Sequence, residues 1–405
     1  MILTANHVIP GDGKTCLAHA GVRIDPQGNL DAVDTAENLK RQFPGEETQD
    51  FGEATILPGL FDMHVHLGYY YSQPDAAEYN DYLIAYYAAE QARLALKLGI
   101  TTVRDLSCPH GLCRQLRAAG EKGFLTAPRI IQADTGLCMS GGHGHTDGIE
   151  QVDGPWNLRA AIRRQVRDGA DWVKILTSNR SDDPEFTQEE LDAAVDECHR
   201  RRIKTAVHAG TQPSIQMCID AGFDTIEHGT FMTEPQARQM AKNGQAWTPT
   251  MTAYIYLHEF CCNLEKEGGG SANPVAARAA KDNAFFGPAA AAYRDNFKRL
   301  YDTGVTVLAG SDMVLYGAPP LPIHQELAYM VQFGITPLQA VETATGNSAK
   351  VLGLEKTTGT LRPGLAADLL VVDGDVSRNI KALDQVRQVY LQGKLVAAPE
   401  TAAER

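Results

Sequence analysis

The sequence lacks the long apolar segment that a membrane-spanning helix requires. No window approaches the roughly 20 consecutive apolar residues needed to cross a bilayer. Residues 1–6 also lack a basic segment followed by an apolar run, so we expect no secretory signal there. These features predict a soluble protein without a membrane partner.

Cysteine pairs with the spacing of a disulfide framework or a zinc clip are also missing. The eight cysteines include no Cys-x-x-Cys pair. The adjacent Cys261 and Cys262 suit neither a normal disulfide nor a zinc clip. A reduced, cytoplasmic setting is the simpler interpretation.

Basic residues are too few to attract nucleic acid. The chain carries 37 Lys and Arg against 50 Asp and Glu, a formal net charge of -13. No basic field therefore exists for phosphates or an anionic membrane surface. The remaining composition, 43% hydrophobic and 21% charged, is ordinary and allows a large core.

Short apolar runs alternate with longer amphipathic stretches between residues 57 and 353. This alternation is typical of a parallel sheet covered by helices, and eight such units predict an α/β fold of the (β/α)8 TIM-barrel type. No Gly-x-Gly-x-x-Gly follows the first strand, which disfavours a dinucleotide-binding fold. The predicted strands cover residues 57–66, 101–106, 129–134, 172–177, 204–209, 225–229, 246–252 and 306–312, and the predicted helices cover 79–98, 156–168, 187–202, 212–221, 234–243 and 274–303.

The two ends of the chain have a different sequence pattern from the middle. Residues 1–56 and 354–405 contain short strand-like pieces separated by Gly and Asn turns. Neither piece is long enough to bury a core alone. We therefore expect a small β-sandwich built from both termini beside a barrel domain of residues 57–353.

Histidines and charged residues stand at the ends of the predicted barrel strands. His64 and His66 are two apart, so on a strand both point to one face. Imidazole is the commonest protein ligand for zinc and similar ions, although a lone His-x-His is weak evidence. Enzymes on this fold place their chemistry at the C-terminal strand ends. Four further residues, Lys174, His208, His228 and Asp312, are predicted to converge there.

Each of these residues also has a structural interpretation when taken alone. His208 or His228 could be a satisfied rim histidine, and Asp312 could cap a helix. Lys174, inside an apolar strand, carries a large desolvation cost unless it is paired or chemically altered. It could pair with an acid such as Glu227, or it could lose its proton and capture carbon dioxide. The resulting carbamate could bridge two cations.

The chain resembles the amidohydrolase superfamily, in particular its prolidase-like, imidazolonepropionase-related branch. The resemblance covers essentially all 405 residues. It implies a distorted barrel with a β-sandwich from the termini, and two zinc ions bridged by a carboxylated Lys174 and a hydroxide. His64, His66 and Asp312 would hold the more buried ion, and His208 and His228 the other. The motifs that carry the resemblance are Leu57-Pro58-Gly59-Leu60-Phe61-Asp62-Met63-His64-Val65-His66, Val173-Lys174-Ile175, His208-Ala209, Ile226-Glu227-His228-Gly229, Gly310-Ser311-Asp312 and Gly359-Thr360-Leu361-Arg362-Pro363-Gly364-Leu365-Ala366-Ala367-Asp368-Leu369.

Such a site would hydrolyse an amide-like bond. Asp312 is the natural group to take a proton from the attacking water and pass it to the leaving nitrogen. A donor for the oxyanion could come from His143 or His145 in the Gly-rich segment after the third strand. A similar Gly-His segment in the resembled branch favours His143, whereas the alternative is an ordinary flexible loop.

The substrate is less well defined by the sequence. Members of the branch are often dipeptidases or carboxypeptidases, and others cleave N-acyl amino acids. We expect a dipeptide or N-acyl amino acid as the small-molecule substrate. Arg180 and either Tyr254 or Tyr256 could bind a free carboxylate, although each of them could instead be structural or solvent-facing. Phe231 could form an apolar wall. The aromatic run Tyr69-Tyr70-Tyr71 could line the mouth of the barrel or form a homo-oligomer contact.

Two other functions compete with this interpretation. A mononuclear deaminase or cyclic-amide hydrolase of the imidazolonepropionase type would lack the bridging lysine and would place an acidic or amide residue soon after the fifth-strand histidine. This chain has Lys174, and Ala209-Gly210-Thr211 follow His208. A non-enzymatic binding protein should have lost ligands, yet every expected position is filled.

Overall fold

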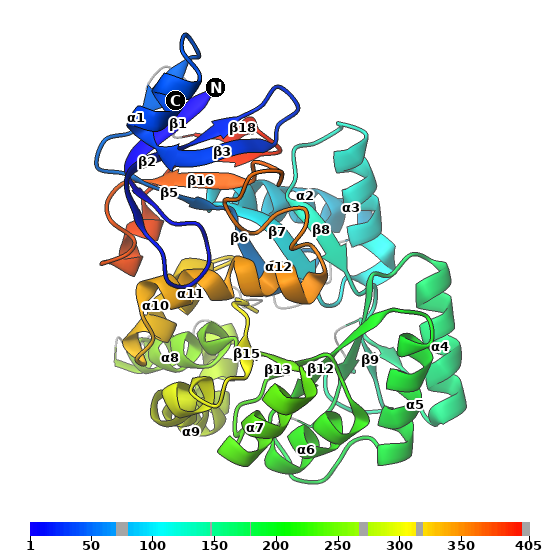
Figure 1. Cartoon of the computed structure of the whole chain (residues 1–405). Coiled ribbons are helices and arrows are strands. Elements are labelled where there is room, and N and C mark those ends of the chain that lie inside the picture. Colours follow the sequence, from blue (N-terminus) through cyan, green and yellow to red (C-terminus); the bar gives the residue numbers. More distant parts are fainter. Residues whose placement is uncertain (70–79, 146–147, 179, 267–273, 313–318, 399–405) are drawn as a thin grey trace.

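The computed structural model describes the chain except residues 70–79, 146–147, 179, 267–273, 313–318 and 399–405. The predicted α/β class is confirmed: strands and helices alternate along most of the sequence (Figure 1). Within the described residues, no helix has both the length and the apolar character needed to cross a bilayer.

Strands from both ends of the chain form one eight-stranded sheet (Figure 1, blue and orange-red). The C-terminal strand β16 pairs antiparallel with β5, and β5 pairs parallel with β1. Leu3, Val22, Ile56 and Leu369 belong to a hydrophobic core of this sheet's own. Its strands are β1 (Ile2–Val8), β2 (Leu17–Ile24), β3 (Leu30–Thr35), β4 (Thr48–Asp50), β5 (Thr55–Pro58), β16 (Leu369–Val372), β17 (Val386–Leu391) and β18 (Lys394–Ala397).

The middle of the chain forms two sheets in which every paired strand is parallel. The first has the order β6-β7-β8, and the second has the order β10-β9-β11-β12-β13-β14-β15. Their strands are β6 (Leu60–Val65), β7 (Ile100–Asp105), β8 (Arg129–Gln132), β9 (Leu137–Cys138), β10 (Glu150–Gln151), β11 (Trp172–Leu176), β12 (Lys204–Ala209), β13 (Thr225–His228), β14 (Ala246–Thr248) and β15 (Thr306–Val307).

Backbone hydrogen bonds link the edges of these two sheets on both sides. At one edge, Met63 N donates to Ala309 O at 2.9 Å and Asp312 N donates to His64 O at 2.8 Å. At the other, Asp171 N donates to Gln132 O at 2.9 Å. The C-terminal ends of β6, β11, β12 and β13 therefore gather around the segment that follows β15.

The helices connect and cover the parallel strands, and several begin at sequence-encoded caps. Thr187 with Glu190, and Thr233 with Gln236, form capping boxes at the starts of α5 and α7. The helices are α1 (Ala36–Gln42), α2 (Asp81–Lys97), α3 (Leu112–Glu121), α4 (Pro155–Arg167), α5 (Gln188–His199), α6 (Gln212–Ala221), α7 (Glu234–Asn243), α8 (Ile255–Lys266), α9 (Pro274–Tyr301), α10 (Ile323–Gln332), α11 (Pro337–Thr343) and α12 (Gly346–Leu352), with short 3-10 helices η2 (Pro109–Gly111), η3 (Met251–Ala253) and η4 (Ile380–Asp384).

The predicted first barrel strand, residues 57–66, is in fact two strands. Its beginning belongs to β5 of the terminal sheet, and β6 starts at Leu60. The division falls at Gly59, where a Cβ atom would lie 2.1 Å from the Thr101 hydroxyl oxygen. Only glycine allows this close crossing, and the chain passes from the terminal sheet to the parallel strands at this residue.

Candidate metal centre

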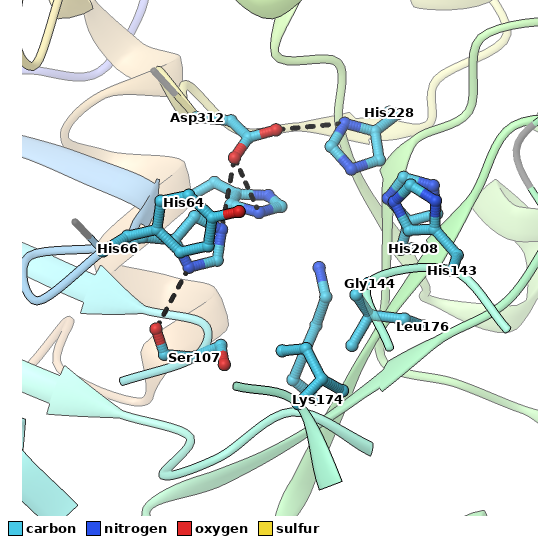
Figure 2. Close-up of a pocket in the computed structure, with 12 residues that line it drawn as sticks. His64, His66, Ser107, His143, Gly144, Lys174, Leu176, His208, His228 and Asp312 are labelled. Carbon is cyan, nitrogen blue, oxygen red and sulfur yellow. Dashed lines mark hydrogen bonds and ion pairs between the residues drawn. The ribbon is translucent and has the colours of Figure 1, made fainter. Parts of the chain in front are cut away.

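The six predicted metal ligands and His143 line one cavity of about 160 Å³ (Figure 2). They come from the ends of β6, β11, β12 and β13, from the segment after β15 and from the loop after β9. The lining residues are His64, His66, Tyr69, Ser107, His143, Gly144, Ile149, Lys174, Leu176, His208, His228 and Asp312.

His64 and His66 present their Nε2 atoms to the same carboxylate. Nε2 of His64 lies 3.5 Å and Nε2 of His66 lies 3.2 Å from Asp312 Oδ1. On the other side of each ring, Nδ1 of His64 donates to Glu227 Oε2 at 3.0 Å and Nδ1 of His66 donates to the Ser107 carbonyl at 3.2 Å. With the proton on Nδ1, each Nε2 directs a lone pair into the cavity, as a metal ligand requires.

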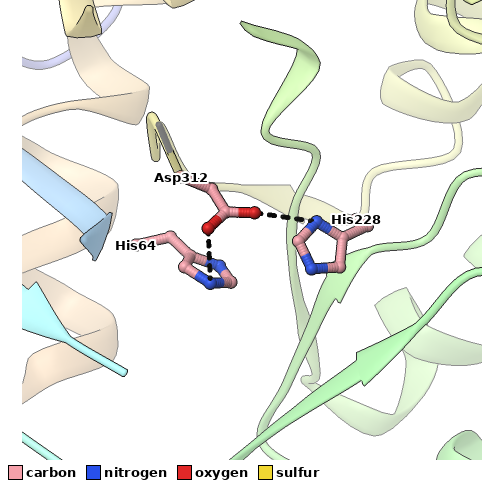
Figure 3. Close-up of side chains that lie close together, drawn as sticks. All are labelled: His64, His228 and Asp312. Atoms are coloured by element: carbon pink, nitrogen blue, oxygen red, sulfur yellow. Dashed lines mark ion pairs between the residues drawn. The ribbon is translucent and has the colours of Figure 1, made fainter. Parts of the chain in front are cut away.

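His228 approaches Asp312 from the opposite side (Figure 3). Its Nδ1 lies 3.8 Å from Asp312 Oδ2 and 2.6 Å from the Thr250 hydroxyl oxygen. Because that hydroxyl donates to the Pro249 carbonyl at 2.7 Å, it can accept a hydrogen bond from Nδ1. Ligand atoms of His64, His228 and Asp312 lie within 4.8 Å of one another, which is close enough for one ion.

His208 completes the other wall of the cavity. Its ring centroid lies 4.3 Å from that of His228 and 4.1 Å from that of His143, which stacks on it at 20°. Nε2 of His208 is buried and has no hydrogen-bond partner in the part of the chain that the structure describes. A buried nitrogen without a partner is costly, and a metal ion would satisfy it.

Lys174 points into the space between the two pairs of histidines (Figure 2). The residue is 2% exposed, and within the described ranges its amine makes no hydrogen bond or ion pair. Burial lowers the pKa of Lys174 to about 8. The amine therefore loses its proton far more readily near physiological pH than the amine of an exposed lysine does.

The acid that could have paired with Lys174 is bonded elsewhere. Glu227 Oε1 accepts from Arg104 Nη2 at 2.8 Å, and its Oε2 accepts from His64. Burial works to raise the pKa of Glu227, but Arg104 and His64 outweigh it and hold that pKa well below its usual range. Both Glu227 oxygens are therefore taken up by Arg104 and His64, and Glu227 orients the His64 ring.

Electrostatics at the site suit bound cations. Burial lowers the pKa of His64 to about 4 and the pKa values of His208 and His228 well below their ordinary value. The three rings are therefore neutral and able to coordinate. Burial opposes ionisation of Glu227 and Asp312, but neighbouring histidines, joined by Arg104 at Glu227, hold both pKa values well below their usual range, so these two carboxylates are anionic beside the buried Arg104 and Lys174. Nitrogen and oxygen donors in this set fit divalent ions such as zinc.

Unusual backbone conformations hold several of these side chains in place. His228, Thr250 and Asp312 have φ angles of 65°, 49° and 44°. Non-glycine residues in this region are strained and cluster at functional sites. Asp62 fixes the segment before Asp312, because its oxygens accept from Ser311 N at 2.9 Å and from Ser311 Oγ at 2.6 Å.

The remaining predicted substrate residues lie beside the cavity and do not line it. Tyr254 packs 5.5 Å from the His228 ring, and Phe231 lies 6.3 Å from Phe285 between ring centroids. The Arg180 guanidinium sits 4.9 Å above the Phe285 ring. The His145 ring bonds to the backbone of its own loop, because its Nδ1 donates to Gly142 O at 2.8 Å.

The sequence reasoning missed several residues that support the ligands. Arg104 donates to Met63 O, Thr225 and Glu227, and Thr250 contacts His228. Glu326 accepts from the backbone of Met251 and Thr252. A charged residue within an apolar strand, as in Thr102-Val103-Arg104-Asp105, is a signal that could have identified Arg104.

An α/β fold with a His/Asp cluster at its strand ends is typical of hydrolases that use metal ions. A model of the amidohydrolase family matches residues 55–396 of this chain. The chain belongs to the amidohydrolase family, and the predicted resemblance is confirmed.

Individual relatives are consistent with this assignment. Ochratoxinase from Aspergillus niger is 27% identical, over 98% of this chain and 87% of the relative. Imidazolonepropionase from Geobacillus kaustophilus is 26% identical, over 85% of this chain and 81% of the relative. The crystal structure of a Xaa-Pro dipeptidase with methionine bound in its active site superposes with a TM-score of 0.83 at 29% identity, covering 97% of this chain and 98% of that one.

Proposed function

We propose that this protein hydrolyses the amide bond of a small substrate, a dipeptide or an N-acyl amino acid, with two divalent metal ions bound in the cavity. The observation that carries the proposal is the meeting of four imidazoles, Asp312 and the buried Lys174 in one cavity. The amidohydrolase family and the name of the Xaa-Pro dipeptidase relative support an amide or peptide bond as the target.

We further propose that the two parallel sheets close into one (β/α)8 barrel beside a terminal β-sandwich. The backbone bonds at both edges, Met63 N to Ala309 O and Asp171 N to Gln132 O, support closure. The barrel would comprise residues 59–353, and the sandwich residues 1–58 and 354–405. Closure would bring all the ligand-bearing strand ends to one face.

His64, His66 and Asp312 would hold one ion, and His208 and His228 the other. Lys174 would lie between them as a carbamate. In that modification the neutral amine nitrogen bonds to the carbon of carbon dioxide and releases one proton, which leaves an anionic carboxyl group on the side chain. Its burial, its lack of a partner and its lowered pKa all support this chemistry.

The bound ions would supply an activated water and polarise the scissile carbonyl. Asp312, whose oxygens face both sides of the centre, would accept the proton of that water and deliver it to the leaving nitrogen. His143 would donate a hydrogen bond to the carbonyl oxygen as negative charge develops there. Beyond the cavity, Tyr254, Phe231 and Arg180 would contact the far end of the substrate.

A mononuclear deaminase or cyclic-amide hydrolase is the second candidate, because imidazolonepropionase is among the relatives. The position of Lys174 between the histidines favours two ions over one.

The proposal is tested by incubating the zinc-loaded protein with a panel of dipeptides, N-acyl amino acids and cyclic amides. We expect hydrolysis of at least one dipeptide or N-acyl amino acid, loss of activity on chelation, and recovery with added zinc. Turnover of cyclic amides alone, or no turnover by protein that carries metal, would contradict the proposal.

A further inference from the structure

The loop that carries His143 is held by hydrogen bonds along its length. Ser140 N donates to Asp153 Oδ1 at 2.9 Å, and Gly141 N donates to Gln151 Oε1 at 2.9 Å. Gly142 N donates to Met139 O at 2.9 Å. With His143 N also bonded, four consecutive amides have acceptors, so this stretch is a defined turn and not a loose connection.

The acceptor for His143 N comes from a different part of the chain. Glu185 Oε2 accepts this amide at 3.0 Å. The carboxylate also approaches Gly142 so closely that a Cβ atom there would lie 2.8 Å from Oε2. Glycine at 142 therefore gives the half-buried Glu185 access to the backbone of the loop.

Glu185 is itself anchored beside the metal-ligand strands. Its backbone N donates to Ser178 Oγ at 3.0 Å, and Ser178 Oγ donates to Asp183 O at 2.9 Å. The Ser178 carbonyl accepts from Gly210 N at 3.1 Å, just after the strand that carries His208. The segment after β11 thus joins the His143 loop to the strand of a ligand histidine.

We infer that Glu185 is a positioning residue that holds His143 against the metal centre. The inference rests on the proposed function, in which His143 donates to the substrate carbonyl. The position that Glu185 would maintain is the stacking of His143 on His208, whose ring centroids lie 4.1 Å apart. Because this donor acts most strongly on the transition state, its displacement should lower kcat more than it raises KM.

Four single variants and one double variant test this inference on the panel substrate that the wild type turns over fastest. We expect His143→Ala to lower kcat by about 10²-fold. Glu185→Ala should lower kcat by roughly 10-fold or more, because small misplacements of a catalytic group are costly. Glu185→Gln keeps an acceptor oxygen and should retain kcat within about threefold. Gln151→Ala, which removes the acceptor for Gly141 in the same turn, should also stay within about threefold.

The double variant separates positioning from a general structural role. In the His143→Ala background, Glu185→Ala should cause no further loss of kcat, because both changes remove the same hydrogen bond from His143 to the substrate carbonyl. The inference would be overturned if the loss of kcat in the double variant equalled the product of the two single losses. It would also be overturned if Gln151→Ala lowered kcat as much as Glu185→Ala does.

A crystal structure of Glu185→Ala with its metal content measured provides a readout besides activity. We expect wild-type metal content and a His143 ring displaced from His208. A ring that stays stacked would overturn the inference. If the wild type hydrolyses no panel member, the proposed function fails, and this structure alone decides whether Glu185 positions His143.

Discussion

The imidazoles of the centre are aimed by the hydrogen bonds at their second nitrogens. Glu227 accepts from His64, the Ser107 carbonyl accepts from His66, and Thr250 contacts Nδ1 of His228. Such partners fix the ring orientation and place the lone pair on the nitrogen that faces the cavity. The fold therefore fixes the orientation of the three rings in the way that the proposed metal binding would require.

Replacement of Asp312 by asparagine tests the proton-transfer role at the scale of one residue. The amide has the same shape, but it cannot take a proton from water. We expect Asp312→Asn to lower kcat by about 10²–10⁴-fold, with circular dichroism and the thermal midpoint close to wild type. Asp302→Asn, at the exposed residue that follows α9, is the matched control. A rate for Asp312→Asn within threefold of wild type would remove Asp312 from the mechanism.

The residues that line the cavity could be predicted from the sequence, because parallel strands bring the residues at their carboxyl ends together. His64, His66, Lys174, His208, His228 and Asp312 all line the cavity as the strand pattern indicates. The partners of Glu227 could not be predicted. Its bonds to Arg104 and His64 join strands far apart in the sequence, and no local pattern encodes them.

At the scale of elements, the short 3-10 helix η3 links the ligands to the outer helices. Glu326 on α10 accepts from Met251 N at 2.9 Å and from Thr252 N at 2.8 Å. Thr252 Oγ1 donates to the Ser311 carbonyl at 2.6 Å, next to Asp312. A buried acid on one helix thus holds the turn that presents Thr250 to His228.

Glu326 also makes a prediction about pH. Burial raises the pKa of Glu326 to about 8, although the Met251 and Thr252 amides oppose this. Because the pKa is higher in the folded state, this group's contribution to stability is fully present below the unfolded value of about 4.3 and is lost as the pH rises to about 8. The free energy of unfolding of the wild type, relative to Glu326→Gln, should fall between about pH 5 and pH 8 and then level off. Urea denaturation of both proteins across this range checks it, and a difference that is constant with pH would refute it.

Elements with a clear periodic pattern were predicted well, and those shaped by tertiary contacts were not. The helices α6 and α7 and the strand β12 have the predicted bounds. The strand predicted over residues 306–312 is shorter in the structure, where β15 ends at Val307. Beyond it, Ala309 N donates to Thr343 O at the end of α11 and not to a neighbouring strand. The helices α1, α3, α8 and α10 to α12 were missed.

For the molecule as a whole, an ion pair connects the terminal sheet with the parallel strands. Arg129 at the start of β8 donates through Nη1 to Asp368 Oδ2 at 3.0 Å, and the Asp368 side chain is fully buried. Asp368 Oδ1 also accepts from Gln392 N at 2.7 Å, and the Asp368 carbonyl accepts from Gly59 N at 2.9 Å. Asp368 therefore links the C-terminal strands and β8 to Gly59, where the chain passes from the terminal sheet to the parallel strands.

We expect Asp368→Asn to lower the free energy of unfolding by about 3 kcal/mol, because it leaves a largely buried arginine without its counter-charge. The exposed pair of Asp373 with Arg387, 3.4 Å apart, provides the control. Asp373→Asn should change stability by less than about 1 kcal/mol. Guanidinium denaturation measures both variants, and equal effects would show that the buried pair does not couple the sheets.

The central claim is a centre of two ions joined through Lys174, and a metal count tests it most directly. Mass spectrometry of the purified, zinc-reconstituted protein should give about two zinc ions per chain. Lys174→Ala should lose most of this metal, and a short carboxylic acid in solution should restore part of the metal and activity. A firm value of one ion per chain, unchanged in Lys174→Ala, would contradict the account.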